Sequence, residues 1–184
     1  MPNIVYIAAS IDGYIARKDG NIDWLAEVPN PDNSDFGFAD FMSDIDAIIM
    51  GRITFETVAG FGEWVYQKPV FVLSSSMLQL PAGYEEKAEI INGELNDIIA
   101  SLHERGLKNL YIDGGRTIQG FIEQDLIDEL VLTRIPILLG SGIPLFTETD
   151  RELQFEHVKT EVLNNALIKS RYKRTREEQG SGRR

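Results

Sequence analysis

Two short segments of the chain carry glycine, arginine and threonine in the same order, each directly after an apolar run. The first is Gly51-Arg52-Ile53-Thr54, and the second is Gly114-Gly115-Arg116-Thr117. The preceding runs, residues 48–50 and 110–113, predict buried strands, and the residues that follow predict helices. A helix that begins at the end of a strand points unpaired N–H groups outward, where glycine and arginine favour a bound phosphate. Two such segments suit a ligand with several phosphates, such as a dinucleotide.

These segments also have a purely structural interpretation, because strand–glycine–helix turns are common in α/β proteins. The repetition of arginine after glycine favours anion binding. The usual dinucleotide fingerprint, G-x-G-x-x-G after the first strand, is missing, and Ser10-Ile11-Asp12-Gly13 stands there instead. The Walker phosphate loop is missing as well. The residues alone therefore predict a nucleotide-binding α/β domain and leave its reaction open.

Strand and helix patterns alternate along the rest of the chain. We expect strands at residues 3–9, 46–50, 70–73, 89–91, 109–112 and 129–135. We expect helices at residues 36–43, 54–59, 95–105 and 117–124. Two more strands, 153–163 and 167–173, flank Asn164-Asn165, which predicts a C-terminal antiparallel hairpin. The alternation predicts an α/β fold with a mostly parallel sheet, helices on both faces and ligands at the carboxyl ends of the strands.

The composition predicts one domain with a substantial core. The chain has 184 residues, of which 43% are hydrophobic. We expect the domain to span residues 1–175 and a disordered polar tail to span residues 176–184. The absence of cysteine excludes disulfides and thiolate metal sites, and the two histidines, His103 and His157, lack the spacing of metal ligands. We therefore expect no metal site.

Charge is unevenly distributed along the chain. The net charge is −11, but residues 1–170 carry 27 acidic and 12 basic side chains, whereas residues 171–184 carry two acidic and six basic ones. The excess of acidic side chains in residues 1–170 argues against a nucleic-acid partner. No signal peptide precedes the first expected strand, and no apolar run approaches the roughly 20 residues that span a bilayer. We therefore expect a cytoplasmic protein without a membrane partner.

The order and spacing of several short motifs resemble dihydrofolate reductase over about residues 3–173. The motifs are residues 7–9, 12–16, 24, 49–56, 72–75, 114–116 and 132–135. The turn from Ser10 to Gly13 and the run 136–142 are closer to the reductase domain of the bifunctional riboflavin-biosynthesis deaminase–reductase, of the same superfamily. The chain resembles stand-alone relatives of that branch and has no deaminase zinc motif. The resemblance implies a dihydrofolate-reductase-like three-layer sandwich.

The resemblance also implies that NADPH is the cofactor. The implied contacts of its adenosine half are Gly51, Arg52, Ile53 and Thr54 on the phosphates, with Arg52 at the 2′-phosphate, and Ser74 and Ser75 beside the ribose. For the other parts of NADPH, the implied contacts are Gly114, Gly115, Arg116 and Thr117 on the pyrophosphate, and Ala9 and Ile15 beside the nicotinamide. Many relatives carry a basic or long polar residue where this chain has Ser76. The preference for NADPH over NADH therefore stays open.

On the substrate side, the resemblance implies contacts from Ala8, Trp24, Phe41, Asp113 and Thr133. Trp24 is equally well explained as a core aromatic residue. Dihydrofolate reductases also carry a carboxylate on the first helix, which binds the substrate and helps to protonate it.

This chain has Gly37 or Phe38 at the position of that carboxylate. Asp35 and Asp40 are neighbours, but a helix N-cap and a solvated helix face explain them better. The sequence therefore identifies no catalytic residue, and efficient reduction of dihydrofolate is in doubt.

Two classes of function follow. The first is an NADPH-dependent reductase of a small heterocycle, either the flavin-pathway pyrimidine 5-amino-6-(5-phosphoribosylamino)uracil or a dihydrofolate-like pterin. The second is a catalytically weak dinucleotide-binding protein that acts as a sensor or partner module. The resemblance and the apolar segment 129–146 further predict a homodimer, unless Ile137, Leu138 and Leu139 pack on their own core.

Overall fold

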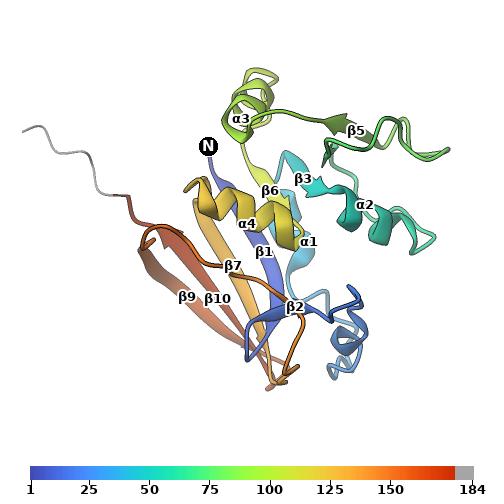
Figure 1. Ribbon diagram of the computed structural model, residues 1–184. Coiled ribbons are helices and arrows are strands. Elements are labelled where there is room, and N and C mark those ends of the chain that lie inside the picture. The colour runs from blue at the N-terminus through green and yellow to red at the C-terminus, as the bar shows by residue number, and fades with distance from the viewer. Residues whose placement is uncertain (177–184) are drawn as a thin grey trace, which may run out of the picture.

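The apolar runs of the sequence form one eight-stranded sheet (Figure 1) in the computed structural model, which describes residues 1–176. The order across the sheet is β5-β4-β3-β6-β1-β7-β10-β9. The strands are β1 Asn3–Ser10, β3 Ala47–Gly51, β4 Val70–Leu73, β5 Ala88–Ile91, β6 Leu110–Asp113, β7 Glu129–Ile135, β9 Phe155–Leu163 and β10 Leu167–Arg174. Each expected strand is present, with ends that differ from the expectation by at most two residues.

The sheet is mostly parallel. β1 pairs in parallel with β6 and β7, β3 with β4 and β6, and β4 with β5. The antiparallel pairs of this sheet are the two that β10 forms, with β7 on one side and with β9 on the other. Asn164 and Asn165 join β9 to β10 with φ angles of 50° and 53°, the left-handed conformation that a tight hairpin turn requires. The predicted parallel sheet with an antiparallel C-terminal strand is confirmed.

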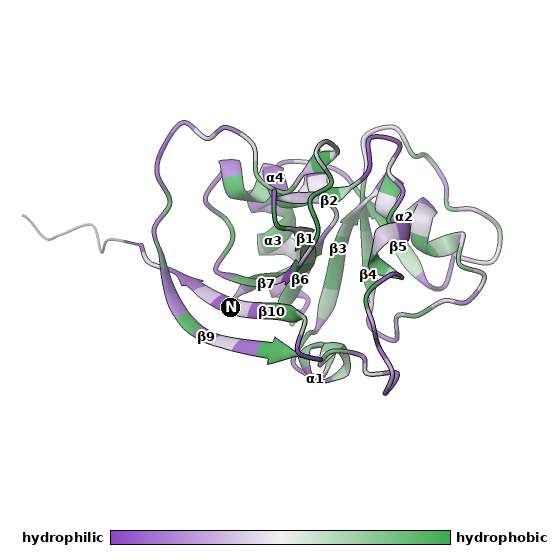
Figure 2. Cartoon of the chain, turned by 90° about the horizontal axis from the view of Figure 1, so that it is seen from below, coloured by the Kyte–Doolittle hydropathy of each residue, from purple (hydrophilic) through white to green (hydrophobic). Residues whose placement is uncertain are grey.

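Helices cover both faces of the sheet, and the expected three-layer arrangement is confirmed (Figure 2). The helices are α1 Phe38–Ser43, α2 Arg52–Ala59, α3 Leu95–Glu104 and α4 Gly115–Glu123. α3 and α4 pack on one face through apolar residues at helical spacing, such as Ile99 and Phe121. Phe41 of α1 and Phe55 of α2 pack on the other face. β3 is buried on both faces, which explains its unbroken apolar sequence.

A second, two-stranded sheet was not expected from the sequence. β2 (Tyr14–Ala16) pairs antiparallel with β8 (Ile143–Pro144), two segments for which the sequence predicted no strand. Gly142 makes this pairing possible, because a Cβ atom there would collide with the carbonyl oxygen of Ala16. A short 3₁₀ helix, η1 (Asp23–Leu25), follows β2. Residues 10–16 and 137–145, which contain β2 and β8, form a small arm beside the main sheet.

The apolar segment after β7 packs mainly on its own molecule. Ile137 and Leu139 join a small core built on Trp24, Ile135 and Leu167, whereas Leu138 is 68% exposed. This segment therefore gives little support to the surface that the sequence singled out for a homodimer.

The C-terminal end of the sheet is fastened by ion pairs. Arg174 of β10 pairs with Asp125 through contacts of 2.7 and 3.1 Å, and both side chains are largely buried. Arg176, the first residue of the expected tail, pairs with Asp128. The rest of that tail, residues 177–184, lies outside the described residues. Within residues 1–176, no helix has the length and apolar character to cross a membrane.

Candidate functional site

The two glycine–arginine segments lie side by side at the carboxyl edge of the sheet. β3 and β6 are parallel neighbours in which Met50 is paired with Asp113, so Gly51 and Gly114 follow at the same level. α2 begins at Arg52 and α4 at Gly115, each directly after its strand. The free N–H groups and positive dipole ends of both helices therefore lie at one edge.

The two segments interlock through their glycines and threonines. A Cβ atom on Gly51 would lie 2.9 Å from Oγ1 of Thr117, and a Cβ atom on Gly114 would collide with Oγ1 of Thr54. Each threonine thus fills the space that the glycine of the other segment leaves open. Gly114 also has a φ of +89°, which other residues rarely adopt. The sequence predicted these four residues as phosphate contacts, and their visible role is to hold the two helix starts together.

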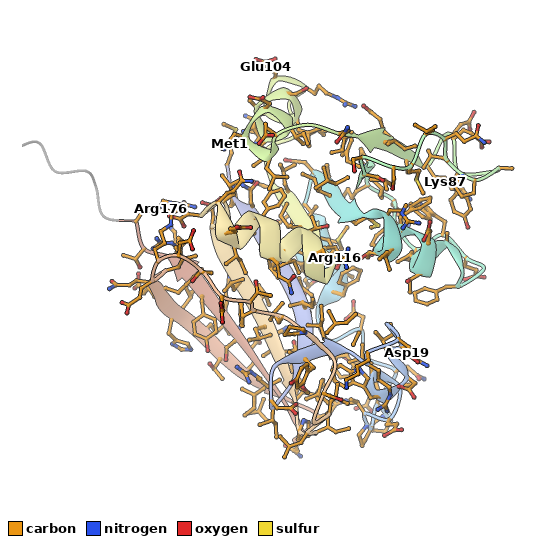
Figure 3. The ribbon with its side chains drawn as sticks, viewed as in Figure 1. Met1, Asp19, Lys87, Glu104, Arg116 and Arg176 are labelled. Atoms are coloured by element: carbon orange, nitrogen blue, oxygen red, sulfur yellow. The ribbon has the colours of Figure 1, made fainter. Side chains whose placement is uncertain are left out.

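The arginines of the two segments lie near the surface. Arg52 Nη1 is 2.9 Å from Glu56 Oε1, and both side chains are about half exposed. Arg116 is exposed at the end of α4 that is turned toward α2 (Figure 3). Arg116 forms no ion pair within residues 1–176. Because both guanidinium groups are accessible, a ligand phosphate can reach each of them.

The serines that follow β4 differ in their surroundings. Ser74 is partly buried, and its Oγ accepts hydrogen bonds from the N–H groups of Ser76 and Met77, at 3.2 and 3.0 Å. Ser75 and Ser76 are exposed. Ser74 therefore shapes the turn after β4, and Ser75 is the more accessible to a ligand.

The arm built from β2 and β8 covers part of the second glycine segment. Ile15 Cδ1 would lie 2.6 Å from a Cβ atom on Gly115, so glycine there is required for the close approach of β2. Ala9, the other residue predicted beside the nicotinamide, is 1% exposed and points into the core beneath α3 and α4. Of these two, Ile15 is the one whose side chain lies at the edge of the sheet.

Asp113 is the carboxylate at the centre of this edge. It is the last residue of β6, and its Oδ1 accepts a hydrogen bond of 2.8 Å from the N–H of Gly114. Its Oδ2 accepts one of 3.3 Å from the hydroxyl of Tyr66. Burial raises the pKa of the Asp113 carboxyl above its usual value, although both hydrogen bonds oppose this shift. Tyr66 lies in the loop between α2 and β4, and no sequence pattern marks it.

The residues predicted on the substrate side fall into two groups. Ala8 and Thr133 are cross-strand partners on β1 and β7, and Trp24 packs beside Ala8. Trp24 is 1% exposed, and its indole N–H finds no acceptor among the described residues. It is therefore a core residue with an unpaired donor, which is costly unless a ligand or water accepts from it. Phe41 lies apart from this group, stacked on Tyr6 with ring centroids 4.5 Å apart.

The first helix offers no place for the carboxylate that dihydrofolate reductases carry. Gly37 has a φ of +84°, and a Cβ atom there would lie 3.0 Å from Lys169 Nζ. Phe38 packs against the rings of Tyr6 and Tyr111. Asp35 accepts hydrogen bonds from the N–H groups of Gly37 and Ala39, which lower the pKa of its carboxyl. Asp35 thus caps the entry to α1, as the sequence favoured.

Two cavities lie away from this edge, with volumes of about 550 and 580 Å³. The first lies below the segment 146–153, and the second beside residues 64–71 and 85–89. Neither is lined by residues of the glycine–arginine segments. Tyr66, whose hydroxyl bonds to Asp113, is among the residues that line the second cavity.

Comparison with known proteins gives the family of the chain. Residues 3–169 match the model of the RibD C-terminal domain, and the chain belongs to that family. Two similar proteins of Bacillus subtilis, YwjB and YyaP, are both uncharacterized. YwjB is 37% identical over 168 residues, which are 89% of this chain and 93% of YwjB. YyaP is 27% identical over 183 residues, which are 92% of this chain and 93% of YyaP.

Solved structures give the same fold. A Shewanella sp. PV-4 protein, provisionally assigned to riboflavin biosynthesis, is 52% identical with a TM-score of 0.93 over 96% of this chain and 100% of that one. The deaminase/reductase of Thermotoga maritima is 17% identical with a TM-score of 0.70, over 95% of this chain and 57% of that one. Dihydrofolate reductase from Enterococcus faecalis, complexed with NADP(H), is 18% identical with a TM-score of 0.65. The match covers 95% of this chain and 97% of that one. These last two likenesses establish the dihydrofolate-reductase-like fold alone.

The packing of Thr54 against Gly114 predicts that a side chain at residue 114 destabilises the fold. We expect Gly114→Ala to lower the free energy of unfolding by about 1–3 kcal/mol, because the methyl group collides with Thr54 Oγ1 and the positive φ strains any other residue. The double variant T54A/G114A should recover part of this loss. Urea denaturation measures both, with Gly120→Ala in α4 as the control, since a Cβ atom there meets only ordinary contacts. Additive effects of T54A and G114A would contradict the interlock.

Proposed function

We propose that this protein is an NADPH-dependent reductase that transfers a hydride to a small heterocyclic substrate. The observation that carries the proposal is the interlocked pair of helix starts at one sheet edge, in a chain of the RibD C-terminal domain family. The runner-up is a catalytically weak dinucleotide-binding protein that acts as a sensor or partner module. The lack of a carboxylate on α1 keeps that alternative open, and hydride transfer from NADPH to any acceptor decides against it.

The residues at this edge fit a dinucleotide. The starts of α2 and α4 lack side-chain caps among the described residues, so their free backbone N–H groups can donate hydrogen bonds to a pyrophosphate and an adenosine phosphate. Arg52 and Arg116 add two cations to a chain whose net charge is −11. In this proposal Ile53, Thr54, Ser74 and Ser75 surround the adenosine half, Gly115, Arg116 and Thr117 the pyrophosphate, and Ala9 and Ile15 the nicotinamide. When bound, NADPH supplies the hydride, and the protein orients the reacting groups.

The substrate would lie against Ala8 and Thr133, with Trp24 and Asp113 as its polar neighbours. Trp24 has a buried indole N–H without an acceptor among residues 1–176, and Thr133 has a hydroxyl on β7 next to Ala8. A ring carbonyl or ring nitrogen accepts from such donors. Both 5-amino-6-(5-phosphoribosylamino)uracil and a dihydrofolate-like pterin present these groups. The absent carboxylate on α1 favours the pyrimidine, since the pterin needs protonation from that side.

Delivery of a hydride must be accompanied by delivery of a proton, and we assign the proton to Asp113. Its burial raises the pKa of the carboxyl, so it stays protonated to a higher pH than an exposed aspartate, and the residue lies at the end of β6 that faces the open edge. A protonated carboxyl can donate to a substrate as a general acid. Tyr66 holds the carboxyl in place through its hydroxyl.

Replacing Arg52 tests the cofactor. We expect Arg52→Ala to weaken NADPH binding about tenfold, the lower part of the range for a charge-assisted bond, because Arg52 is half exposed and shared with Glu56. NADH binding should be unchanged, because NADH lacks the 2′-phosphate. Fluorescence titration with both cofactors measures this, and Glu56→Gln, which frees Arg52, serves as the matched control with tighter NADPH binding. Equal losses for NADPH and NADH would contradict the assignment of Arg52 to the 2′-phosphate.

The pH dependence of the reaction tests Asp113. Because its pKa is raised, we expect the rate of hydride transfer to fall as the pH rises through that pKa and the proton is lost. Asp113→Asn should remove this limb of the profile and lower the rate by about 100-fold or more. Tyr66→Phe removes a hydrogen bond that lowers the pKa, so it should move the limb to higher pH. A limb that survives unchanged in Asp113→Asn would rule out Asp113 as the proton donor.

We also propose that the protein is a homodimer formed through β9. This strand ends the sheet, so one row of its backbone groups has no partner strand among residues 1–176, and Val158 and Val162 on it are 54% and 65% exposed. Antiparallel pairing of two copies about Thr160 brings Lys159 opposite Glu161 and brings Val162 near Val158, the extra residue of a β-bulge. Charge and apolar surface are then both self-complementary.

Sedimentation tests the dimer. At micromolar concentration we expect the protein to sediment as a dimer and Val162→Asp to sediment as a monomer, because the substitution brings an acidic side chain to each Val158 at the interface. Val65→Asp, at an equally exposed valine far along the chain from β9, should remain dimeric. A wild-type monomer, or a dimer unaffected by Val162→Asp, would contradict this interface.

A further inference from the structure

Asp12 joins two segments that lie far apart in the sequence. Its carboxylate accepts hydrogen bonds from Ser10 Oγ at 2.6 Å, from the N–H of Leu139 at 3.1 Å and from the N–H of Gly140 at 2.7 Å. The last two bonds span 127 and 128 residues of sequence. A side chain that only capped its own turn would need the local bond alone. Asp12 therefore links the turn before β2 to the segment before β8.

Further bonds make these two segments into one unit. The N–H of Ile11 donates to the carbonyl of Ile137 at 2.9 Å, and the N–H of Leu145 donates to the carbonyl of Gly13 at 2.9 Å. Arg134 Nη1 donates to the carbonyl of Ile11 at 2.8 Å. With the pairing of β2 and β8, residues 10–16 and 137–145 form the arm described above. Asp12 is the acidic side chain that bonds across the two halves of this arm.

The arm lies directly on the second glycine segment. Ile15 Cδ1 occupies the space that a Cβ atom on Gly115 would need, and Ile143 Cγ2 lies 3.5 Å from the same position. Gln119 Nε2 of α4 donates to the carbonyl of Pro144 at 2.7 Å, which ties β8 to the same helix. A change in how the arm is held therefore moves Ile15 relative to Gly115.

We propose that Asp12 is a positioning residue, which holds the arm so that Ile15 stays over the start of α4 and retains the cofactor there. This inference rests on the proposed function, because it takes the start of α4 as the pyrophosphate site. The three hydrogen bonds of the Asp12 carboxylate all lie within the arm, so in this proposal Asp12 acts through the arm. Without its carboxylate, Leu139 and Gly140 lose their acceptor and the arm can lift from Gly115.

Hydrogen exchange and cofactor release test this role together. In Asp12→Ala we expect the amides of Leu139 and Gly140 to exchange at least about tenfold faster. We expect NADPH to dissociate about tenfold faster, by stopped-flow fluorescence, with its association rate nearly unchanged. Asp12→Asn keeps one acceptor and should lie between Asp12→Ala and the wild type. Asp19→Ala is the matched control, since Asp19 is an exposed carboxylate just after β2 whose one hydrogen bond within residues 1–176 is from the N–H of Asn21.

The outcomes separate this inference from the proposed function. Faster exchange with faster NADPH release, both absent in Asp19→Ala, supports the positioning role. Unchanged exchange in Asp12→Ala overturns the inference, as does faster exchange with an unchanged release rate. A wild-type protein that binds no NADPH overturns the proposed function, and the exchange measurement still shows in that case whether Asp12 holds the arm.

Discussion

The mutual packing of two glycine–threonine pairs is the constraint on which the rest of this site depends. Thr54 fills the space over Gly114, and Thr117 fills the space over Gly51. Because the parallel pairing of β3 and β6 sets these residues at one level, the starts of α2 and α4 are fixed relative to each other. The positive ends of the two helices are thereby held at a fixed spacing. Such preorganisation is what lets a site bind an extended anion without a large loss of conformational entropy.

The chemistry at this edge differs from that of dihydrofolate reductase in the place of its carboxylate. The first helix begins with Gly37 in a left-handed conformation beside Lys169, and aromatic packing around Phe38 fills the rest. The buried acid is instead Asp113, at the end of a strand and next to the glycines. In the proposed function, the proton therefore comes from the end of a strand and not from the first helix. The proposed substrate contacts Ala8, Thr133 and Asp113 are likewise strand residues.

Much of the fold could be predicted from the sequence, because strands such as β3 and β6 are unbroken apolar runs and α3 has apolar residues at helical spacing. The glycine–arginine segments were visible for the same reason, since each follows such a run. The arm could not be predicted from the sequence, because β2 and β8 have only three and two residues. Their pairing depends on tertiary contacts such as that between Gly142 and Ala16. The bond from Tyr66 to Asp113 spans 47 residues and lies in no pattern. The site residues assigned from the resemblance remain predictions.

The central claim is that both helix starts bind one dinucleotide, and calorimetric titration with NADPH and with its two halves tests it most directly. The halves are 2′,5′-ADP and reduced nicotinamide mononucleotide. If both helix starts take part, NADPH should bind at least about 100-fold more tightly than either half, because the second contact is made within one molecule. If 2′,5′-ADP binds as tightly as NADPH, only the first helix start is engaged, and the account of a shared site is contradicted.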